Sequence, residues 1–377
     1  MNVMSASASA VPTAPPRITG FGYVRPLGSG GFADVYQYEQ DMPRRVVAVK
    51  VLRSSITEAR DRSDFEAEAD AMARLSSHPS IVSVYSTGVS ADGRPYIAME
   101  FCPESMRELT RNRPAYLQTV LDAGVRLAGA LETAHQAGIL HRDIKPSNVL
   151  LTAADRPALT DFGISMLQGR HSSEASEQAL SVPWASPEVL SGATTGTVAS
   201  EIWSLGATLY TFAAGFPPFE ARDPALNTRS KMSARIAQAK YTPIAGVQGY
   251  EPFDAVMARA MQLQPGGRFS SMHEFGEALR QLQRGYGFDV TPLDLVSPNK
   301  VTPAADGSTP RGPVITTVRS TSRAQQRAEL RGTRADVDGV VEDRPVSSLK
   351  AGVIGAAIAV VALGGLLAAA LALGWLG

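Results

Sequence analysis

The apolar residues of this chain follow two different spacings in two successive regions, and this change constrains the fold more than any other feature. Runs of strand length come first, as in Arg45–Leu52 (RVVAVKVL). After Pro103, longer runs with helical spacing follow, as in Leu117–Ala137 and Ile202–Ala214. Further elements are expected at about Asp64–Leu75 for a helix, and near Ile81–Thr87 and Tyr96–Phe101 for strands. A β-rich part followed by an α-rich part predicts an α+β protein with two lobes of different class.

Compositional shifts mark the ends of this globular region, which runs from Arg17 to about Gly285 with the first lobe ending near Cys102. Residues 1–16 have neither a basic segment nor a long apolar run, which predicts a disordered N-terminus and not a signal peptide. From Tyr286 to Lys350, Pro, Ser, Thr, Gly, Asp and Arg dominate without a sustained period. This composition predicts a flexible juxtamembrane linker. Its basic middle, Lys300–Arg334, could contact anionic lipid, but a solvated linker is the simpler interpretation.

The charge balance and the cysteine count exclude several classes of protein. The 377 residues contain 36 Lys and Arg against 36 Asp and Glu, so the formal net charge is zero. This balance argues against a nucleic-acid-binding protein of the polybasic kind. The apolar fraction of 44% is enough for a buried core. Cys102 is the only cysteine, which excludes an intramolecular disulfide and a cysteine-based zinc site and fits a reducing cytosolic setting.

The stretch Ala351–Gly377 contains no charged residue. About 20 apolar helical residues cross the hydrocarbon core of a membrane, so this run predicts a C-terminal transmembrane helix. A buried core helix is the alternative, but such helices are seldom apolar on every face over this length. Arg344 and Lys350 lie just before the run, and positive residues mark the cytoplasmic side of a span. We therefore expect a protein anchored in the cell membrane by a single C-terminal pass, with the preceding residues in the cytoplasm.

A glycine-rich loop, Gly28–Ala33 (GSGGFA), lies between two strand-like segments. Glycines allow backbone N–H groups to approach phosphate oxygens without a Cβ in the way. The loop is not a dinucleotide-binding motif, because no helix starts on it, and it lacks the Gly-Lys-Ser/Thr ending of a Walker A loop. Alone, the pattern is weak, and an ordinary glycine-rich hairpin is the more common explanation.

Lys50 lies on the strand that follows this loop, within Val47-Ala48-Val49-Lys50-Val51. Alternate residues of a strand share a face, so the three valines are expected to point into a core and Ala48 and Lys50 to point the other way. A small residue beside a lysine leaves room for a flat base and supplies a cation for its phosphates. A solvent-facing lysine is the alternative, since most lysines are exposed.

Glu68 is the expected partner of Lys50. Phe65, Met72 and Leu75 form an apolar stripe at helical spacing, and Glu68 lies on the same face. A glutamate on a buried face needs a partner, and Lys50 is the natural candidate. A glutamate that reaches solvent from the edge of the stripe is the alternative.

Two further motifs follow in the α-rich region: His141–Leu150 reads HRDIKPSNVL and Asp161–Gly163 reads DFG. Together with the glycine loop, Lys50 and Glu68, in this order, they make the chain resemble a eukaryotic-type (Hanks-type) Ser/Thr protein kinase of the bacterial membrane-anchored subgroup. The resemblance covers roughly Ile18–Gln283. It implies a bilobal protein-kinase fold, with a β-rich N-lobe and an α-rich C-lobe, beside the C-terminal transmembrane helix.

The resemblance implies roles for four catalytic residues. Asp143 would accept the proton of the substrate hydroxyl and orient that hydroxyl, and Lys145 would reach the γ-phosphate. Lys50 would hold the α- and β-phosphates of ATP, and Glu68 would fix Lys50. Phosphoryl transfer depends on such positioning and charge neutralisation more than on covalent help.

The same resemblance implies ATP and magnesium as cofactors, with manganese as an alternative ion. Asn148 and Asp161 would hold the metal, since magnesium prefers oxygen ligands. Met99 would be the gatekeeper residue, and the backbone of Glu100 and Cys102 would meet the adenine. The residues implied to bind ATP are Leu27, Gly28, Ser29, Gly30, Gly31, Val35, Ala48, Lys50, Met99, Glu100, Cys102 and Leu150. Cys102 is otherwise simply a small packed residue.

Later landmarks also match the family, and these are structural positions. Ser186-Pro187-Glu188 stands where the family has Ala-Pro-Glu, and Arg268 is placed to pair with Glu188. Ser181 aligns with the residue that bonds the catalytic aspartate and lysine, here Asp143 and Lys145.

Glu201 is a departure from the family pattern, which has aspartate before Ile-Trp-Ser. That carboxylate caps the backbone of the His-Arg-Asp turn, so one extra methylene must be absorbed. We therefore expect a less firmly held catalytic loop, and a kcat that Glu201→Asp preserves or raises.

Arg142 precedes Asp143 and can bind a phosphate on the activation loop, which implies control by phosphorylation of that loop. No threonine occurs in Ile164–Ala185, so the candidate phosphorylation sites are Ser172, Ser173 and Ser176. Small residues four apart in the expected span could pack two helices into a homodimer for trans-autophosphorylation. The abundance of Ala and Gly in this span is the simpler explanation.

The sequence therefore predicts a membrane-anchored Ser/Thr protein kinase that transfers the ATP γ-phosphate to protein serine and threonine hydroxyls and phosphorylates itself. Two alternatives remain. One is a catalytically weak kinase-like binding module, and the other is a small-molecule kinase. Lys145, Ser186-Pro187-Glu188 and Arg268 favour protein substrates.

Overall fold

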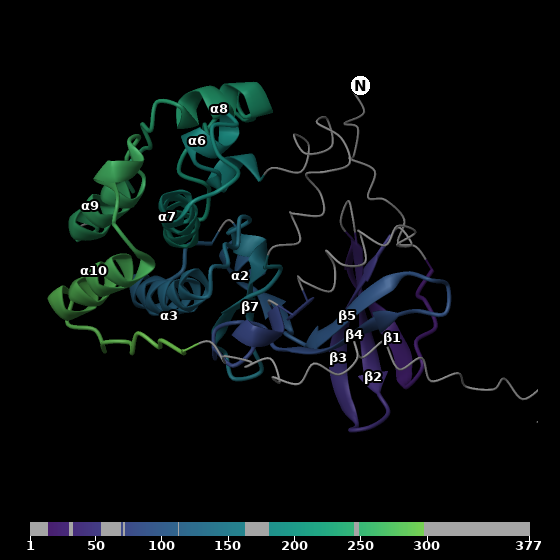
Figure 1. Ribbon diagram of the computed structural model, residues 1–377. Coiled ribbons are helices and arrows are strands. Elements are labelled where there is room, and N and C mark those ends of the chain that lie inside the picture. Colours follow the sequence, from purple (N-terminus) through teal and green to yellow (C-terminus); the bar gives the residue numbers. More distant parts are fainter. Residues whose placement is uncertain are drawn as a thin grey trace, which may run out of the picture. The chain divides into compact units, whose positions relative to one another are not determined.

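A computed structural model describes residues 14–29, 33–53, 69–70, 72–111, 113–162, 181–244 and 249–297. All of them belong to the first of the two units into which the chain divides, Met1–Thr302 and Pro303–Gly377. The architecture given below is that of the first unit (Figure 1).

The first lobe is built on a five-stranded antiparallel sheet in the order β1-β2-β3-β5-β4. Its strands are β1 (Phe21–Ser29), β2 (Ala33–Gln40), β3 (Arg45–Leu52), β4 (Val84–Val89) and β5 (Pro95–Glu100). β3 has the bounds expected from sequence. The strand expected near Ile81 begins later, at Val84, because Ile81 forms an isolated parallel bridge with Leu159 in the second lobe.

The central strand β3 separates two apolar clusters, as its alternation predicts. Val47, Val49 and Val51 are fully buried in one cluster, while Ala48 belongs to the other. The first cluster also contains Tyr36 and Tyr38 of the neighbouring strand. Lys50 therefore leaves the sheet on the face of Ala48, which is the face of the larger core that continues into the second lobe.

The second lobe is mainly helical and contains a small antiparallel sheet. The sheet has the order β6-β7-β8, with β6 (Glu104–Ser105), β7 (Val149–Leu151) and β8 (Pro157–Leu159). The helices are α2 (Met106–Thr110), α3 (Leu117–Gln136), α6 (Pro187–Leu190), α7 (Val198–Ala214), α8 (Arg229–Ile236), α9 (Glu251–Ala260) and α10 (Met272–Gly285). Short 3-10 turns occur at Pro146–Asn148, Val182–Trp184, Pro224–Leu226 and Pro265–Gly267.

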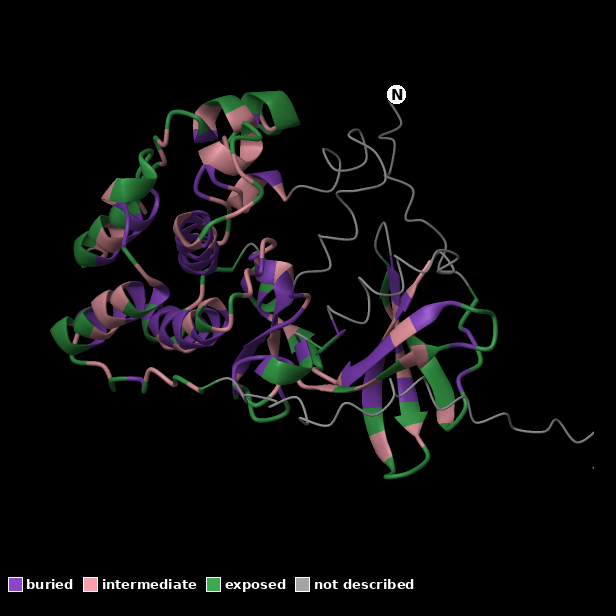
Figure 2. Cartoon of the chain, in the orientation of Figure 1, coloured by how far each residue is buried: buried purple, intermediate pink, exposed green. Residues whose placement is uncertain are grey.

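The helices α3 and α7 form the core of this lobe. Both are buried over most of their length, and they are largely purple in Figure 2. α7 begins with a capping box at Thr197 and ends at Gly215, whose φ of 84° is left-handed. Such ends satisfy the backbone groups that a helix leaves without internal partners. α3 packs against β8, which leads to Asp161, and α7 packs against the turn at Pro146–Asn148 that follows Asp143.

The packed chain begins earlier than the sequence suggests. Residues 14–16 were expected in the disordered N-terminus. The carbonyl of Pro16 instead accepts a hydrogen bond from the Tyr38 hydroxyl at 2.7 Å, and that of Ala14 accepts one from Arg94 Nη2 at 3.0 Å. These bonds attach the segment to the first lobe.

The packed chain also ends later than Gly285, so the expected linker does not begin at Tyr286. Thr291 is buried, its N–H donates to Gln283 Oε1 at 3.0 Å, and its hydroxyl donates to Asp122 Oδ1 at 2.8 Å. Further on, Val296 N donates to Thr133 Oγ1 at 3.2 Å. The polar, aperiodic composition resembles a linker, but here the polar groups find partners on α3 and α10.

Within the described ranges, no helix combines the length and the hydropathy that a membrane span requires. The expected span at residues 351–377 lies outside those ranges, as does most of the expected linker.

Candidate active site

Lys50 and Asp161 come together from the two lobes. Lys50 Nζ on β3 lies 2.6 Å from Asp161 Oδ1, which follows β8 by two residues. Burial alone would raise the pKa of Asp161, but the neighbouring Lys50 ammonium outweighs it, and the net pKa is lowered from its usual value. Asp161 is therefore a carboxylate at neutral pH, and it stands beside a cation.

Asp143, Lys145 and Ser181 form a connected polar group. Ser181 Oγ donates to Asp143 Oδ1 at 2.8 Å, and Lys145 Nζ donates to Ser181 Oγ at 2.9 Å. Lys145 Nζ also lies 2.7 Å from Asp143 Oδ2. The contact of Ser181 with both residues is as predicted. The group presents a carboxylate and an ammonium at one place, as transfer of a charged phosphoryl group to a hydroxyl requires.

Asn148 is oriented by the same aspartate. Its amide nitrogen donates to the Asp143 carbonyl at 2.8 Å and to Asp143 Oδ2 at 3.1 Å. Among the described residues, the Asn148 amide oxygen has a 3.4 Å contact from the Ser147 hydroxyl. Asn148 and Asp161 thus offer hard oxygen donors, which fit magnesium, an ion that takes its remaining ligands from water and phosphate. The described residues contain no cluster of three His, Cys, Asp or Glu side chains that would form an all-protein metal cage.

The backbone of the His141–Asp143 turn is held by Glu201 of α7. Glu201 Oε1 accepts the Arg142 N–H at 2.6 Å, and Glu201 Oε2 lies 2.6 Å from His135 Nε2 on α3. Arg142 has a φ of 65°, a left-handed conformation that non-glycine residues adopt only when the surroundings hold them. The sequence suggested a loosely held loop at this position, but the longer glutamate reaches both partners.

Phe162, next to Asp161, is buried with its ring centroid 4.5 Å from that of His141. The DFG phenylalanine thus packs inward while its aspartate faces Lys50.

The Nε atom of Arg142 is buried and has no hydrogen-bond partner among the described residues.

The apolar side chains expected around a nucleotide base belong to, or pack against, the larger core that continues into the second lobe. Ala48 and Met99 are buried in it, and Leu27, Val35, Leu150 and Cys102 pack against it. Burial, with a smaller contribution from the charge of Glu100, raises the pKa of the Cys102 thiol to about 12. Cys102 is therefore a neutral packing residue, which agrees with its expected passive role.

The glycine loop is closed at its base by a charged group that the sequence did not reveal. Ser29 Oγ donates to Asp34 Oδ1 at 2.7 Å, and Arg53 Nη2 donates to the same oxygen at 2.8 Å. Asp34 is fully buried, whereas Arg53 is partly exposed. Gly28 and Ser29 end β1 and are exposed, while Gly30 and Gly31 lie outside the described residues.

Glu188 and Arg268 form the predicted ion pair. Arg268 Nη1 and Nη2 contact the two Glu188 oxygens at 2.6 and 2.9 Å, and the Arg268 side chain is fully buried. Burial opposes the charged form of Glu188, but the hydrogen bonds from Arg268 outweigh it, so the pKa of Glu188 is lowered. Arg268 also donates to backbone carbonyls at Gln262 and Ala199. The pair therefore ties the segment after Ser181 to α7 and to the turn before α10.

Several predicted residues lie outside the described part of the chain. These are Glu68, the intended partner of Lys50, and the candidate phosphorylation sites Ser172, Ser173 and Ser176. Residues 72–75, at the end of the helix expected to carry Glu68, include Met72 and Leu75 as buried core residues, as the stripe predicts.

Sequence reasoning missed His135, Asp34 and Arg53. For His135 there was a signal: it lies near the end of a predicted helix, six residues before His141, and Glu201 departs from the kinase family pattern. For Asp34 and Arg53 the signal is weaker, because β2 and β3 bring them together only through their register, Asp34 opposite Val51.

Comparison with known proteins agrees with this geometry. Residues 21–276 match the family model described as the protein kinase domain. PknK, a Ser/Thr protein kinase of Mycobacterium tuberculosis, is 40% identical over 296 residues, which cover 76% of this chain and 26% of that protein. PknB of Mycobacterium leprae is 33% identical over 273 residues, covering 69% of this chain and 42% of PknB.

A solved structure also resembles the chain. The crystal structure of the Mycobacterium tuberculosis PknI kinase domain has a TM-score of 0.53 and 29% sequence identity, and it covers 70% of this chain and 96% of its own. The chain spans about a quarter of the length of PknK, so the likeness to PknK is confined to that part. The family match, covering more than half of the chain, and the shared fold together show that the chain belongs to the protein kinase family, among the Hanks-type bacterial Ser/Thr protein kinases.

Proposed function

We propose that the chain is an ATP- and magnesium-dependent Ser/Thr protein kinase. The observation that carries the proposal is the group formed by Asp143, Lys145 and Ser181, with Asn148 bonded to the same aspartate. A second charged pair, Lys50 of the first lobe with Asp161 of the second, joins the two lobes.

Each residue has a defined task in this proposal. Asp143 accepts the proton of the attacking hydroxyl and orients its oxygen, and Lys145 neutralises charge on the transferred phosphoryl group. Ser181 keeps the two together, since its hydroxyl donates to one and accepts from the other. Lys50 binds the α- and β-phosphates. Asn148 and Asp161 would hold magnesium, which would supply charge neutralisation on the phosphates.

Protein substrates are favoured over small molecules by the second lobe. The buried Glu188–Arg268 pair organises the segment that follows Ser181, beside the catalytic group. The relatives PknK and PknB are named as Ser/Thr protein kinases, which supports the same substrate class.

The proposal includes a membrane anchor and control by phosphorylation. The uncharged run at residues 351–377 supports a single C-terminal pass with the kinase domain in the cytoplasm. The buried Nε of Arg142, which has no hydrogen-bond partner among the described residues, supports a role in binding a phosphate after autophosphorylation, with Ser172, Ser173 and Ser176 as acceptors. A homodimer is the form in which one copy phosphorylates the other.

The activity is tested with labelled ATP, magnesium and a general protein substrate, using the full chain and the variants Lys50→Met and Asp143→Asn. Exposed residues give matched controls: Lys240→Met, and Asp155→Asn, whose φ of 55° asparagine tolerates. Both active-site variants are expected to abolish transfer to serine and threonine, while both controls retain it. Equal transfer by Asp143→Asn would contradict the assignment of the base.

The anchor is tested by fractionating cells that produce the full chain or a chain ending at Lys350. The full chain is expected in the membrane fraction and the shortened one in the soluble fraction. Recovery of both in the soluble fraction would contradict the anchor without affecting the assigned activity.

A further inference from the structure

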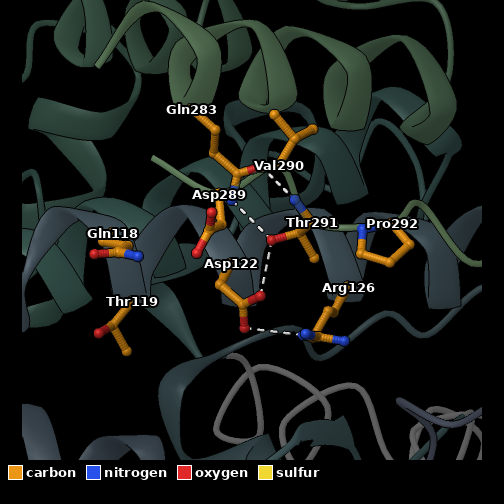
Figure 3. A pocket seen from close by; sticks show the side chains of 9 residues that line it. All are labelled: Gln118, Thr119, Asp122, Arg126, Gln283, Asp289, Val290, Thr291 and Pro292. Atoms are coloured by element: carbon orange, nitrogen blue, oxygen red, sulfur yellow. Dashed lines mark hydrogen bonds and ion pairs between the residues drawn. The ribbon is translucent and has the colours of Figure 1, made fainter. Parts of the chain in front are cut away.

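The segment after α10, residues 288–296, is here called the strap. It runs from the end of α10 along α3 toward β7 (Figure 1). Figure 3 shows Thr291 of the strap between Gln283 on α10 and Asp122 on α3, with the hydrogen bonds that join them. At its far end, Val296 N donates to Thr133 on α3. Both ends of the strap are therefore attached to the second lobe.

Two helix glycines form a seat for the strap. A Cβ at Gly129 in α3 would lie closer to the Asp294 carbonyl than real Cβ atoms approach a backbone oxygen. A Cβ at Gly276 in α10 would lie 2.8 Å from Leu293 Cδ1. Glycine inside a helix is less favourable than alanine, so each position needs a reason, and the strap supplies it. The two helices are shaped to receive this segment.

Asp294 connects the strap to two segments next to β8, the turn at His78 and the residue Arg156. Its carbonyl lies 3.0 Å from His78 Nε2, and its carboxylate lies 3.6 Å from Arg156 Nη2. Arg156 directly precedes β8, and His78 lies in the turn before Ile81, which pairs with Leu159 of β8. One strap residue thus touches the two segments that border the strand leading to Asp161.

The hydrogen bonds of His78 define its tautomer. His78 is buried, and its Nδ1 accepts the Ser80 N–H at 3.0 Å. Nδ1 therefore carries no proton, so Nε2 carries it and donates to the Asp294 carbonyl. Desolvation lowers the pKa of His78, which agrees with a neutral ring. Both nitrogens are satisfied only while the strap is in place.

The chain of hydrogen bonds continues from Ser80 to the active site. The Ser80 carbonyl accepts the Leu159 N–H at 2.9 Å, and the Leu159 carbonyl accepts the Val82 N–H at 2.8 Å. Asp161 follows Leu159 by two residues and holds Lys50. The path from Asp294 through His78, Ser80 and Leu159 to Asp161 is contiguous, and such chains of hydrogen bonds and packed groups are the kind of network that carries coupling between sites.

We propose that the strap is a positioning element of the catalytic site: Asp294, through His78 and Arg156, fixes β8 and with it the Asp161 carboxylate. Release of the strap loosens β8 and displaces Asp161 relative to Lys50. The effect on catalysis rests on the proposed kinase function, but the effect on β8 does not.

The test uses the full chain and Gly129→Ala, whose methyl group displaces the strap at Asp294 and leaves every catalytic side chain unchanged. Gly285→Ala at the end of α10 is the matched control, because no heavy atom of the described residues lies within 4 Å of the added Cβ. Thr133→Val is a milder variant that removes the acceptor of the Val296 N–H while keeping the side-chain shape. Thr133→Val takes the place of Gly129→Ala in the test if Gly129→Ala fails to fold.

Amide hydrogen exchange reports the coupling without any need for activity. In Gly129→Ala, exchange at Thr291 and Val296 is expected to rise, and exchange at Ser80, Val82 and Leu159 to rise with it by about tenfold. Gly285→Ala is expected to match the unmutated chain. The activity arm then predicts a lower kcat and a higher magnesium concentration for half-maximal rate, with the KM for the protein substrate unchanged.

Faster exchange in the strap with unchanged protection at Ser80 and Leu159 would overturn the proposal. So would a strap that keeps its own protection in both Gly129→Ala and Thr133→Val, because the seat would then not determine its place. If the unmutated chain shows no phosphotransfer, the proposed function fails, while the exchange result still decides the coupling.

Discussion

His135 Nε2 lies 2.6 Å from Glu201 Oε2, inside the second lobe, and both side chains are buried. The other oxygen of Glu201 holds the backbone N–H of Arg142. A glutamate at this position thus connects α3, α7 and the turn that carries Asp143. The additional methylene, which looked like a defect in the sequence, gives the carboxylate the reach for both contacts.

This relationship reverses the expectation for Glu201→Asp. The shorter side chain cannot keep both contacts at 2.6 Å, and a hydrogen bond to a charged group contributes about 1.5–3 kcal/mol. We predict that kcat falls by roughly 10- to 100-fold with a smaller change in KM for ATP. Steady-state kinetics, with the exposed Glu220→Asp as control, measure it. An unchanged or higher kcat would show that the loop does not depend on the second contact.

Acid should weaken the fold through Glu188. The pKa of Glu188 is lowered in the folded state, so the unfolded chain binds a proton more readily as pH falls. The stabilisation is complete above the usual pKa of 4.5 and is lost below it. Glu188→Gln is expected to cost on the order of 3 kcal/mol at pH 7, because Arg268 remains buried without its partner. It should also lose less stability than the unmutated chain between pH 5 and about pH 3.

Urea unfolding across this pH range measures both effects, with Glu220→Gln as an exposed control. Parallel pH dependence in Glu188→Gln and the unmutated chain would contradict the role of the Glu188–Arg268 pair.

Cys102 should resist alkylation in the folded protein. The thiolate is the reactive form, and a pKa of about 12 leaves almost none of it at neutral pH. Iodoacetamide is expected to label the folded chain at least about 100-fold more slowly than the chain in denaturant. Because the chain has one cysteine, intact mass reports the site directly. Similar rates in both states would contradict a partly buried, protonated thiol.

Arg53 should stabilise the glycine loop and thereby ATP binding. Arg53→Met removes the cation beside the buried Asp34, at a cost of about 2 kcal/mol, reduced from that of a fully buried pair because Arg53 is partly exposed. The KM for ATP is expected to rise several-fold with little change in kcat. Arg53→Lys should raise the KM for ATP less than Arg53→Met does, but not leave it unchanged. A single ammonium replaces a guanidinium that bonds both Ser29 and Asp34. An unchanged KM for ATP would show that this charged group does not contribute to nucleotide binding.

The catalytic side of the site could be predicted from the sequence because its residues lie in short, ordered motifs. The alternation of Val47, Val49 and Val51 placed Lys50 on the correct face of β3. The resemblance to the kinase family implied the hydrogen bond between Asp143 and Ser181, although 38 residues separate them. In these cases local periodicity or a fixed motif carries the information.

The strap could not be predicted in this way. Many of its contacts are made by polar side chains and backbone groups, such as Thr291 and the Asp294 carbonyl, which leave no periodic pattern. The only trace in the sequence is indirect: Gly129 and Gly276 interrupt two helices where alanine would be more favourable. Their reason becomes visible only when a segment about 165 residues from the first of them packs there.

The most direct test of the central claim is the identity of the phosphorylated product. The full chain is incubated with γ-labelled ATP, magnesium and a general protein substrate, and the labelled protein is hydrolysed to its amino acids. The account predicts phosphoserine and phosphothreonine, and their loss in Asp143→Asn with folding unchanged. Label on a small molecule only, or no transfer by the unmutated chain with either magnesium or manganese, would contradict it.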